Sequence, residues 1–315
     1  MSDSVVVIRS VEERTEQACL DIVRAQVGAD TPVHIVRNKP FAEAHVESMR
    51  LAVHSATKWA LFLDADVLLR RNAIPDMLDE ANAIPGPFYM LNFQVLDRGF
   101  DGPAYGVHLY SVAHLRSALQ LTETIYDVQR PESHLCIEMA HRARVPSLRS
   151  ARLVGLHGYE QFYTDLYRTT FVRAVKFARH TNYLLRLYRS RYESDSGGDF
   201  EYRVMLWGLL DGMIYRGSNS QAPLDKAQYE DKALAVLALL GLRERGTFSS
   251  EGYPIDQIIN GHVPNEHYHE IAGHVCPAGD IAVGVPDRSM RRLIRRIVRS
   301  PRTRLKRIVE VALHG

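Results

Sequence analysis

The sequence predicts an α/β fold with a mainly parallel sheet, followed by a helical region. Within about the first seventy residues, short β-branched runs such as SVVVI (4–8) alternate with segments of helical period, which is the order that a parallel sheet with right-handed crossovers requires. The stretch WALFLDADVLLRR (59–71) is continuously apolar up to two aspartates. Such a run is typical of a strand that is buried on both faces.

The other expected elements follow from apolar spacing and from turn residues. Strands are expected at 4–8, 32–37, the start of 59–71, 88–95, 107–111 and 153–156. Helices are expected at 12–27, 41–57, 74–83, 112–121 and 131–144, and the glycine-rich segment 97–106 should be a loop.

Beyond Tyr159 the pattern changes to long helical stretches, 163–192 and 201–215, with a flexible loop expected at SDSGG (194–198). We therefore divide the chain into a domain at 1–160, a helical region at 161–287 and a basic tail at 288–315.

The composition is that of a soluble globular protein, with 46% hydrophobic and 24% charged residues among 315. We find neither a signal peptide nor a run long enough to span a membrane. The three cysteines, Cys19, Cys136 and Cys276, are odd in number and far apart. This usage indicates a reduced, cytoplasmic setting.

The tail concentrates the positive charge, because residues 288–307 hold ten Arg or Lys and no acid while the net charge is only +2. Apolar residues recur at helical spacing between the arginines, so an amphipathic helix is expected. Two interpretations stay open: segment 288–313 packs on the rest of the protein, or it lies peripherally on the anionic inner face of a membrane. Nucleic acid is not expected as a partner, since the basic stretch lacks interleaved aromatics.

The acidic pair Asp64 and Asp66 stands where an open α/β sheet places its ligands, past the carboxyl end of a buried strand. If the strand stays extended through both residues, their carboxylates share one face and can hold a hard cation whose remaining positions suit phosphate oxygens. The alternative is a turn followed by a helix N-cap, for which aspartate is also common.

Taken together, SVVVI, the following helix, the Asp-Ala-Asp of WALFLDADVLL and the glycine-rich segment before YGVHLY resemble the GT-A fold glycosyltransferases, most of all family 2, over roughly residues 4 to 160. The resemblance implies a Rossmann-like nucleotide-sugar domain. It also implies that Asp64 and Asp66, with Ala65 between them, bind Mn²⁺ or Mg²⁺ and thereby the diphosphate of a nucleotide-sugar donor.

A second landmark of that family is an acidic residue at the head of a helix, and RPESHLCI (130–137) is similar to it. The resemblance makes Glu132 the base of an inverting transfer, although Pro131 replaces the first acid of the family pattern. A carboxylate there is able to take the proton of an acceptor hydroxyl. The alternative is that Glu132 only favours the positive end of a helix.

Three further residues are candidates for binding. His157 ends an expected strand, and the resemblance implies a third metal ligand there; a structural hydrogen bond is the alternative. Arg9 and Arg50 stand where relatives bind the nucleotide, and an arginine can stack on a base or pair with phosphate. A solvated arginine is the alternative for both.

Two other groups of polar residues have less specific patterns. Asp97 and Asp101 flank the glycine-rich segment that could contact an acceptor, and a polar turn is the plainer interpretation. Histidines cluster near Cys276, but their spacing matches no common zinc pattern. A loop over the donor or acceptor is the favoured interpretation of this cluster, which comprises His262, His267, His269 and His274.

The sequence thus predicts a metal-dependent hexosyltransferase that uses a nucleotide-sugar donor and an unknown acceptor, either a glycan or a lipid-linked one. A homodimer is left open. The rivals are a nucleotidyltransferase and a catalytically silent nucleotide-binding or membrane-scaffold protein. A phosphatase of the haloacid dehalogenase class is disfavoured because its Asp-x-Asp normally ends the first strand.

Overall fold

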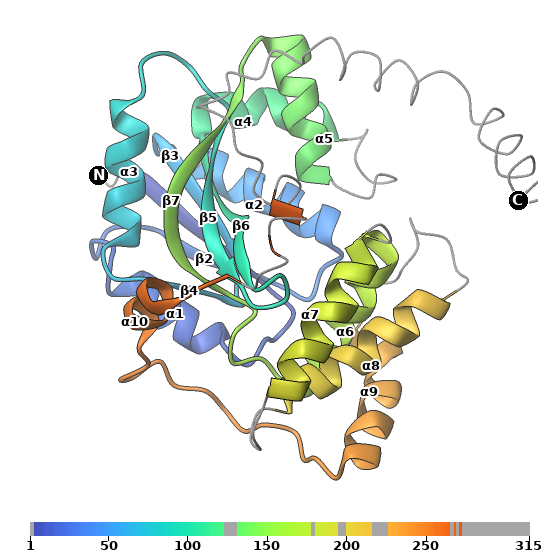
Figure 1. Cartoon of the computed structure of the whole chain (residues 1–315). Coiled ribbons are helices and arrows are strands. Elements are labelled where there is room, and N and C mark those ends of the chain that lie inside the picture. Colours follow the sequence, from blue (N-terminus) through green and yellow to red (C-terminus); the bar gives the residue numbers. More distant parts are fainter. Residues whose placement is uncertain are drawn as a thin grey trace, which may run out of the picture. The chain divides into compact units, whose positions relative to one another are not determined.

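The computed structural model describes residues 3–122, 131–177, 180–194, 200–215, 226–264, 268 and 271–272 (Figure 1). Residues 1–282 form one compact unit and residues 283–315 a second. Cys276, His267, His269, His274, most of the loop expected at 194–198 and the whole basic tail lie outside the described residues. The predicted boundary at residue 160 stays a prediction.

The core of the first unit is a seven-stranded sheet of order β2-β1-β3-β6-β5-β7-β4. The strands are β1 (Ser4–Ser10), β2 (Val33–Arg37), β3 (Trp59–Asp64), β4 (Val67–Leu69), β5 (Met90–Asp97), β6 (Gly102–Ser111) and β7 (Ser147–His157). Strands β2, β1, β3, β5 and β7 run in one direction, and β6 and β4 run against them. The prediction of a mainly parallel α/β sheet is therefore confirmed.

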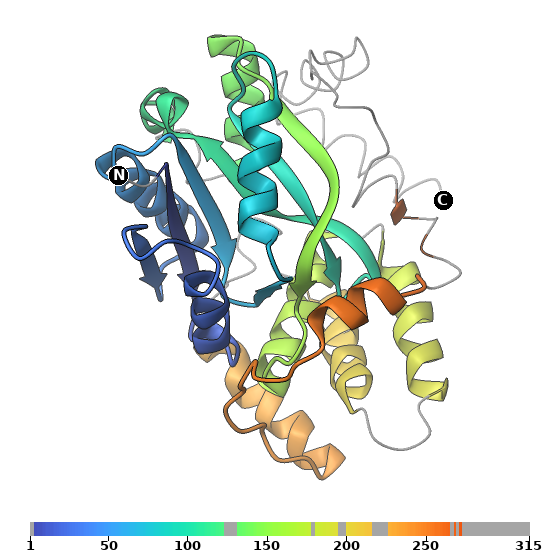
Figure 2. The ribbon, with the colours of Figure 1, turned by 90° about the vertical axis from the view of Figure 1, so that its left-hand side faces the viewer.

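Helices cover both faces of this sheet (Figure 2). Alternate residues of β1 explain why, since Val6 and Ile8 join the core on one face while Val5 and Val7 join the core on the other. The first face is covered by α1 (Glu16–Arg24) and α3 (Ala73–Ala83), and the second by α2 (Phe41–His54), α4 (Val112–Leu119) and α5 (Pro131–Glu138).

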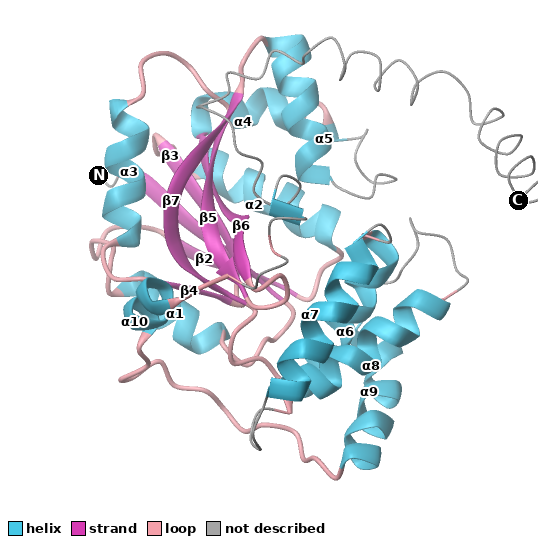
Figure 3. Cartoon of the chain, viewed as in Figure 1, coloured by secondary structure: helices cyan, strands magenta, loops and turns pink. Residues whose placement is uncertain are grey.

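A further group of helices pack mainly on one another (Figure 3). They are α6 (Tyr163–Lys176), α7 (Thr181–Ser194), α8 (Glu201–Ile214) and α9 (Lys226–Leu240). Buried aromatic residues such as Tyr167, Phe171 and Tyr188 form their core. Helix α10 (Ile255–Gly261) packs instead against β7, and its Ile255 lies in a small core with Leu68 and Leu156. Among the described residues, no helix is both long enough and apolar enough to cross a membrane.

Some predicted boundaries were wrong. The helix expected at 12–27 begins only at Glu16, because Glu13 and Ser10 accept the backbone N–H groups of Val11 and Glu12 and fold that segment as a turn. The loop expected at 97–106 is a hairpin, with β5 extending to Asp97 and β6 beginning at Gly102. The helical stretch 163–192 is divided into α6 and α7.

Candidate functional site

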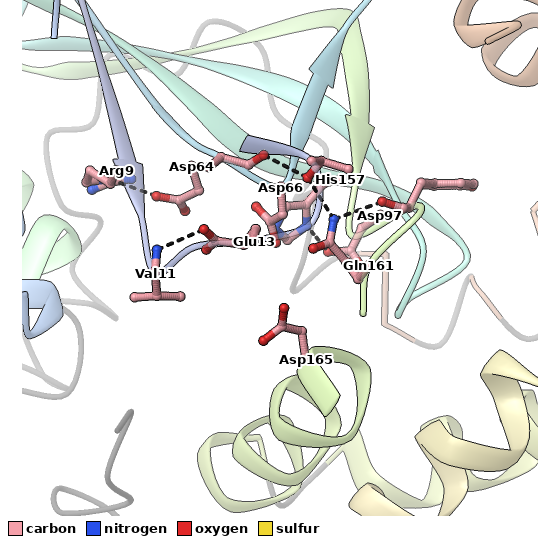
Figure 4. A network of polar contacts seen from close by, with 12 residues as sticks. Arg9, Val11, Glu13, Asp64, Asp66, Asp97, His157, Gln161 and Asp165 are labelled. Atoms are coloured by element: carbon pink, nitrogen blue, oxygen red, sulfur yellow. Dashed lines mark hydrogen bonds and ion pairs between the residues drawn. The ribbon is translucent and has the colours of Figure 1, made fainter. Parts of the chain in front are cut away.

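Polar side chains gather where the parallel strands end (Figure 4). Arg9 lies near the end of β1, Asp64 ends β3, Asp97 ends β5 and His157 ends β7. Because these strands run in the same direction, their carboxyl ends meet at one edge of the sheet. Asp66 follows β3 at the same edge and is brought beside His157.

The strand does not stay extended from Asp64 to Asp66, so the condition under which the two carboxylates would share one face is not met. Ala65 and Asp66 form a turn between β3 and β4. Two hydrogen bonds of Ala65 hold this turn in place. Its N–H donates to the Arg9 carbonyl (2.8 Å), and its own carbonyl accepts from Thr15 Oγ1 (2.8 Å). The turn sends the Asp64 and Asp66 side chains to different partners.

Asp64 belongs to an ion-pair group centred on Arg9. The Arg9 side chain is only 5% exposed, and its Nε donates to Asp64 Oδ1 at 2.8 Å while its Nη1 donates to Glu132 Oε1 at 2.6 Å. Its guanidinium also stacks over the Phe41 ring, 4.8 Å from the centroid. Arg9 thus joins the acidic end of β3 to Glu132 at the head of α5.

The Glu132 carboxylate is surrounded by three basic side chains, Arg9, His45 and His108. Burial alone would raise the pKa of its carboxyl, but the positive charge of Arg9, with smaller effects of His108 and His45, lowers the pKa well below the usual range. A ring nitrogen of each histidine lies 3.5 Å from the Glu132 carboxylate. A carboxylate with so low a pKa is a weak proton acceptor while Arg9 is bound to it.

Asp66 belongs to a second group, which is a chain of contacts through His157. Asp97 Oδ2 lies 2.6 Å from His157 Nδ1, and Asp66 Oδ2 lies 3.3 Å from His157 Nε2. Asp97 is held from behind by the two Nη atoms of Arg173, at 2.9 and 2.8 Å. Burial would lower the pKa of His157, but the carboxylates of Asp66 and Asp97 outweigh it and raise that pKa well above the usual value.

The residues around Asp66 fit a cation. The Oδ1 atom of Asp66 is buried and has no hydrogen-bond partner, and burial together with the charge of Asp66 raises the pKa of nearby Glu13 to about 7. Carboxylate and imidazole are suitable ligands for Mn²⁺. Within the described part of the chain, no three His, Cys, Asp or Glu side chains are already grouped as a metal site, so Asp66 and His157 would hold an ion jointly with ligand oxygens.

The structure does not bring Arg50 to either group. Its side chain is 60% exposed on α2, and it lies 3.9 Å from the Glu47 carboxylate on the same helix. Asp101 is buried and pairs with Arg191, and the backbone carbonyl of Asp101 lies 3.3 Å from His262 Nε2. The zinc and loop interpretations of the histidine cluster concern three residues outside the described ranges, so only His262 is placed.

Sequence reasoning missed several residues of the site. Glu13 was assigned to a helix and Asp97 to a polar turn, whereas both lie beside Asp66 and His157. Continuing the expected strand 88–95 by two residues would have placed Asp97 at a strand end. Gln161 and Asp165 carry no recognisable sequence signal, because they reach the site through the fold of α6 and of the turn before it.

No family model matches the chain, and no curated protein matches it. Among solved structures, it is similar to mannosyltransferase PcManGT from Pyrobaculum calidifontis, in complex with GDP-Man and Mn²⁺ (13% identity, 76% of this chain and 75% of that one, TM-score 0.36). It is also similar to a putative nucleotide-diphospho-sugar transferase from Desulfovibrio desulfuricans G20 (11%, 65% and 94%, TM-score 0.34).

A third similar structure is a CMP:2-keto-3-deoxy-manno-octonic acid synthetase complexed with CTP (10% identity, 50% of this chain and 92% of that one, TM-score 0.29). At these scores the similarity says nothing about individual site residues, so the chemistry of the site is inferred from its own side chains.

Proposed function

We propose that this protein is a metal-dependent glycosyltransferase that transfers a sugar from a nucleotide-sugar donor to an acceptor. The observation that carries the proposal is the contact chain from Asp97 through His157 to Asp66, next to Asp64 and Arg9 at the carboxyl ends of parallel strands. Open α/β sheets bind their ligands at that edge.

His157 and Asp66 would bind the cation, and Asp97 would orient His157. Asp97 accepts the Nδ1 proton of His157, an arrangement that commonly orients a histidine ligand, and a bound cation would replace the second proton at Nε2, which faces Asp66. Asp66 Oδ1 would be the second ligand, and Asp64 lies on the other side of the turn. The bound cation would supply the positive charge that stabilises a departing diphosphate.

Arg9 would bind the diphosphate of the donor, and Glu132 would act on the acceptor. Arg9 is bound to two carboxylates, and a diphosphate beside it would compete for the same guanidinium. Once Arg9 is drawn away, the pKa of Glu132 rises and its carboxylate becomes a better base. Glu132 would then take the acceptor hydroxyl's proton, giving a single displacement with inversion.

The test is metal-dependent nucleotide binding. Thermal shift with UDP, GDP, CMP and dTDP compounds, with and without Mn²⁺, should show one nucleotide that stabilises the protein only with the metal. Asp66→Asn should remove that stabilisation. Asp76→Asn, which changes a half-buried carboxylate of α3 that pairs with Arg70, should keep it.

Two outcomes would favour the rival functions. Absence of both metal-dependent nucleotide binding and nucleotide-sugar hydrolysis would favour a binding or scaffold protein. Release of pyrophosphate from a nucleoside triphosphate and a sugar would identify a nucleotidyltransferase.

A further inference from the structure

Two histidines face the carboxylate of Glu132. On β6, His108 places its Nε2 3.5 Å from Glu132 Oε2, and on α2, His45 places its Nδ1 3.5 Å from Glu132 Oε1. These distances are long for hydrogen bonds, but such contacts in catalytic sites often tighten only when a substrate is bound. The proposed base therefore has two neighbours to which it could pass a proton.

The ring of His108 is oriented by Asn92. The two residues lie directly opposite each other in the antiparallel pair of β5 and β6, so their side chains share one face of the sheet. Asn92 Oδ1 lies within hydrogen-bond distance of His108 Nδ1. An amide oxygen has no hydrogen to donate, so Nδ1 carries the ring proton. In neutral His108, the nitrogen that faces Glu132 then carries a lone pair.

His45 is the poorer proton acceptor of the two histidines. Its side chain is completely buried, and its ring lies against those of Phe41, Phe62 and Tyr110. Burial lowers the pKa of His45 to about 4. The side chain of His108 is 13% exposed, so a proton on His108 can pass on to water. The geometry therefore favours His108.

We propose that His108 positions Glu132 and receives from it the proton that Glu132 removes from the acceptor. The O–H bond of the Glu132 carboxylic acid breaks, its electron pair restores the carboxylate, and the proton bonds to the lone pair of His108 Nε2. The imidazolium then returns to its neutral form by giving the Nε2 proton to water. The inference rests on the proposed function and adds to it a residue that acts through Glu132.

Displacement of Arg9 by a diphosphate would favour both proton transfers. Burial lowers the pKa of His108, the Glu132 carboxylate opposes this effect, and the positive charge of Arg9 lowers the pKa further. When Arg9 is drawn away, the pKa of His108 rises, so His108 becomes a better proton acceptor as Glu132 becomes a better base. The other titratable groups near His108 in the described residues are Asp64 on β3, His45 on α2 and Tyr110 on β6.

Ring-nitrogen NMR tests the tautomer without any substrate. In ¹⁵N-labelled wild-type protein near neutral pH, His108 should show a protonated Nδ1 and an unprotonated Nε2, with its signals assigned by their absence in His108→Gln. Asn92→Leu removes the acceptor at Nδ1 and should give a mixture of tautomers. A protonated Nε2 in the wild-type protein would overturn the proposal, because no lone pair would then face Glu132.

Hydrolysis of UDP-glucose and GDP-mannose with Mn²⁺ tests the proton transfer, with water in place of the unknown acceptor. His108→Gln should lower kcat about 10-fold or more and leave KM unchanged, since proton transfer by a positioned group contributes about 10²- to 10⁴-fold. Asn92→Asp keeps an acceptor at Nδ1 but adds a negative charge, which raises the pKa of His108. Because Nε2 has to be unprotonated, the acidic limb of the kcat profile should move to higher pH.

The control is His54→Gln, which makes the same substitution at the exposed end of α2, where His54 Nδ1 lies 2.8 Å from the Arg50 carbonyl. This variant should keep the wild-type kcat and pH profile. A wild-type protein that neither binds nucleotides with Mn²⁺ nor hydrolyses nucleotide-sugars would refute the proposed function, and the proton transfer with it. Wild-type hydrolysis with an unchanged kcat in His108→Gln would refute the role of His108 alone. If His108→Gln fails to fold, an unchanged pH profile in Asn92→Asp would refute it instead.

Discussion

Arg9 donates a hydrogen bond to Glu132 at 2.6 Å, although the two residues are 123 positions apart in the sequence. The same guanidinium holds Asp64, so one buried arginine joins the end of β3 to the head of α5. Because Arg9 is 5% exposed, both carboxylates depend on it for compensation of their charge. Arg9 therefore contributes both to the stability of the fold and to the candidate site.

Removing Arg9 should destabilise the protein strongly. Arg9→Met keeps the apolar volume but leaves the Glu132 carboxylate buried without its main partner, and breaking a buried pair in this way costs about 3 kcal/mol or more. The free energy of unfolding in urea measures the loss. Arg50→Met removes an arginine that is 60% exposed, and should change stability by about 0.5 kcal/mol or less. Equal effects of the two variants would contradict a structural role for the Arg9 pairs.

The lowered pKa of Glu132 predicts how stability changes in acid. The pKa in the folded state lies below the reference value of 4.5, so the stabilisation is present above pH 4.5 and is lost as the pH falls below it. A single proton changes stability by at most about 1.4 kcal/mol per pH unit. Between pH 4.5 and pH 3, the free energy of unfolding of the wild-type protein should therefore fall by up to about 2 kcal/mol more than that of Glu132→Gln.

Urea unfolding at several pH values checks this difference. Glu193→Gln is the matched control, since Glu193 pairs with Arg189 on the surface and is 56% exposed. The free energy of unfolding of Glu193→Gln should change with pH as that of the wild-type protein does. If the free energy of unfolding of Glu132→Gln falls with pH as steeply as that of the wild-type protein, Glu132 is not the carboxylate that causes the acid sensitivity.

The sheet could be predicted from the sequence because the apolar pattern of each strand is a local feature of the chain. Alternating and continuous apolar runs identify strands wherever one or both faces are buried, and Val5 to Ile8 are fully buried as the pattern requires. The hairpin between Asp97 and Gly102 was missed because glycine content was taken as evidence for a loop. In the structure the backbone of 102–105 pairs with β5, the strand directly before it in the chain.

The site was predictable only in part, because its geometry depends on contacts between distant segments. Asp64 and His157 were expected at strand ends because each ends an apolar run, and the structure places them there. The role of Asp97 depends on His157 and Arg173, which are 60 and 76 residues away. The turn at Ala65 likewise depends on Arg9 and Thr15, so residues 59–71 alone do not reveal it.

Asp97 should control cation binding without being a ligand. Asp97→Asn weakens the contact that orients His157, and losing such a partner typically lowers metal affinity about 10- to 100-fold. Mn²⁺ titration followed by electron paramagnetic resonance measures the affinity directly, without any substrate. Asp76→Asn, on α3, should bind Mn²⁺ like the wild-type protein. Unchanged affinity in Asp97→Asn would remove His157 from the proposed ligands.

The contact between α6 and α8 should be intolerant of even one added carbon. A Cβ at Gly212 would lie 2.5 Å from the Phe171 carbonyl oxygen and 2.7 Å from Ala174 Cβ, and neither neighbour is the end of a flexible side chain. The helices must therefore separate, and overpacking of this kind costs about 1 to 3 kcal/mol. Gly246→Ala adds the same carbon where nothing lies within 4 Å, so its thermal unfolding midpoint should stay near that of the wild-type protein. Since α6 carries Arg173, which holds Asp97, Gly212→Ala should also weaken Mn²⁺ binding. A stable variant with normal Mn²⁺ binding would show that this packing does not position the site.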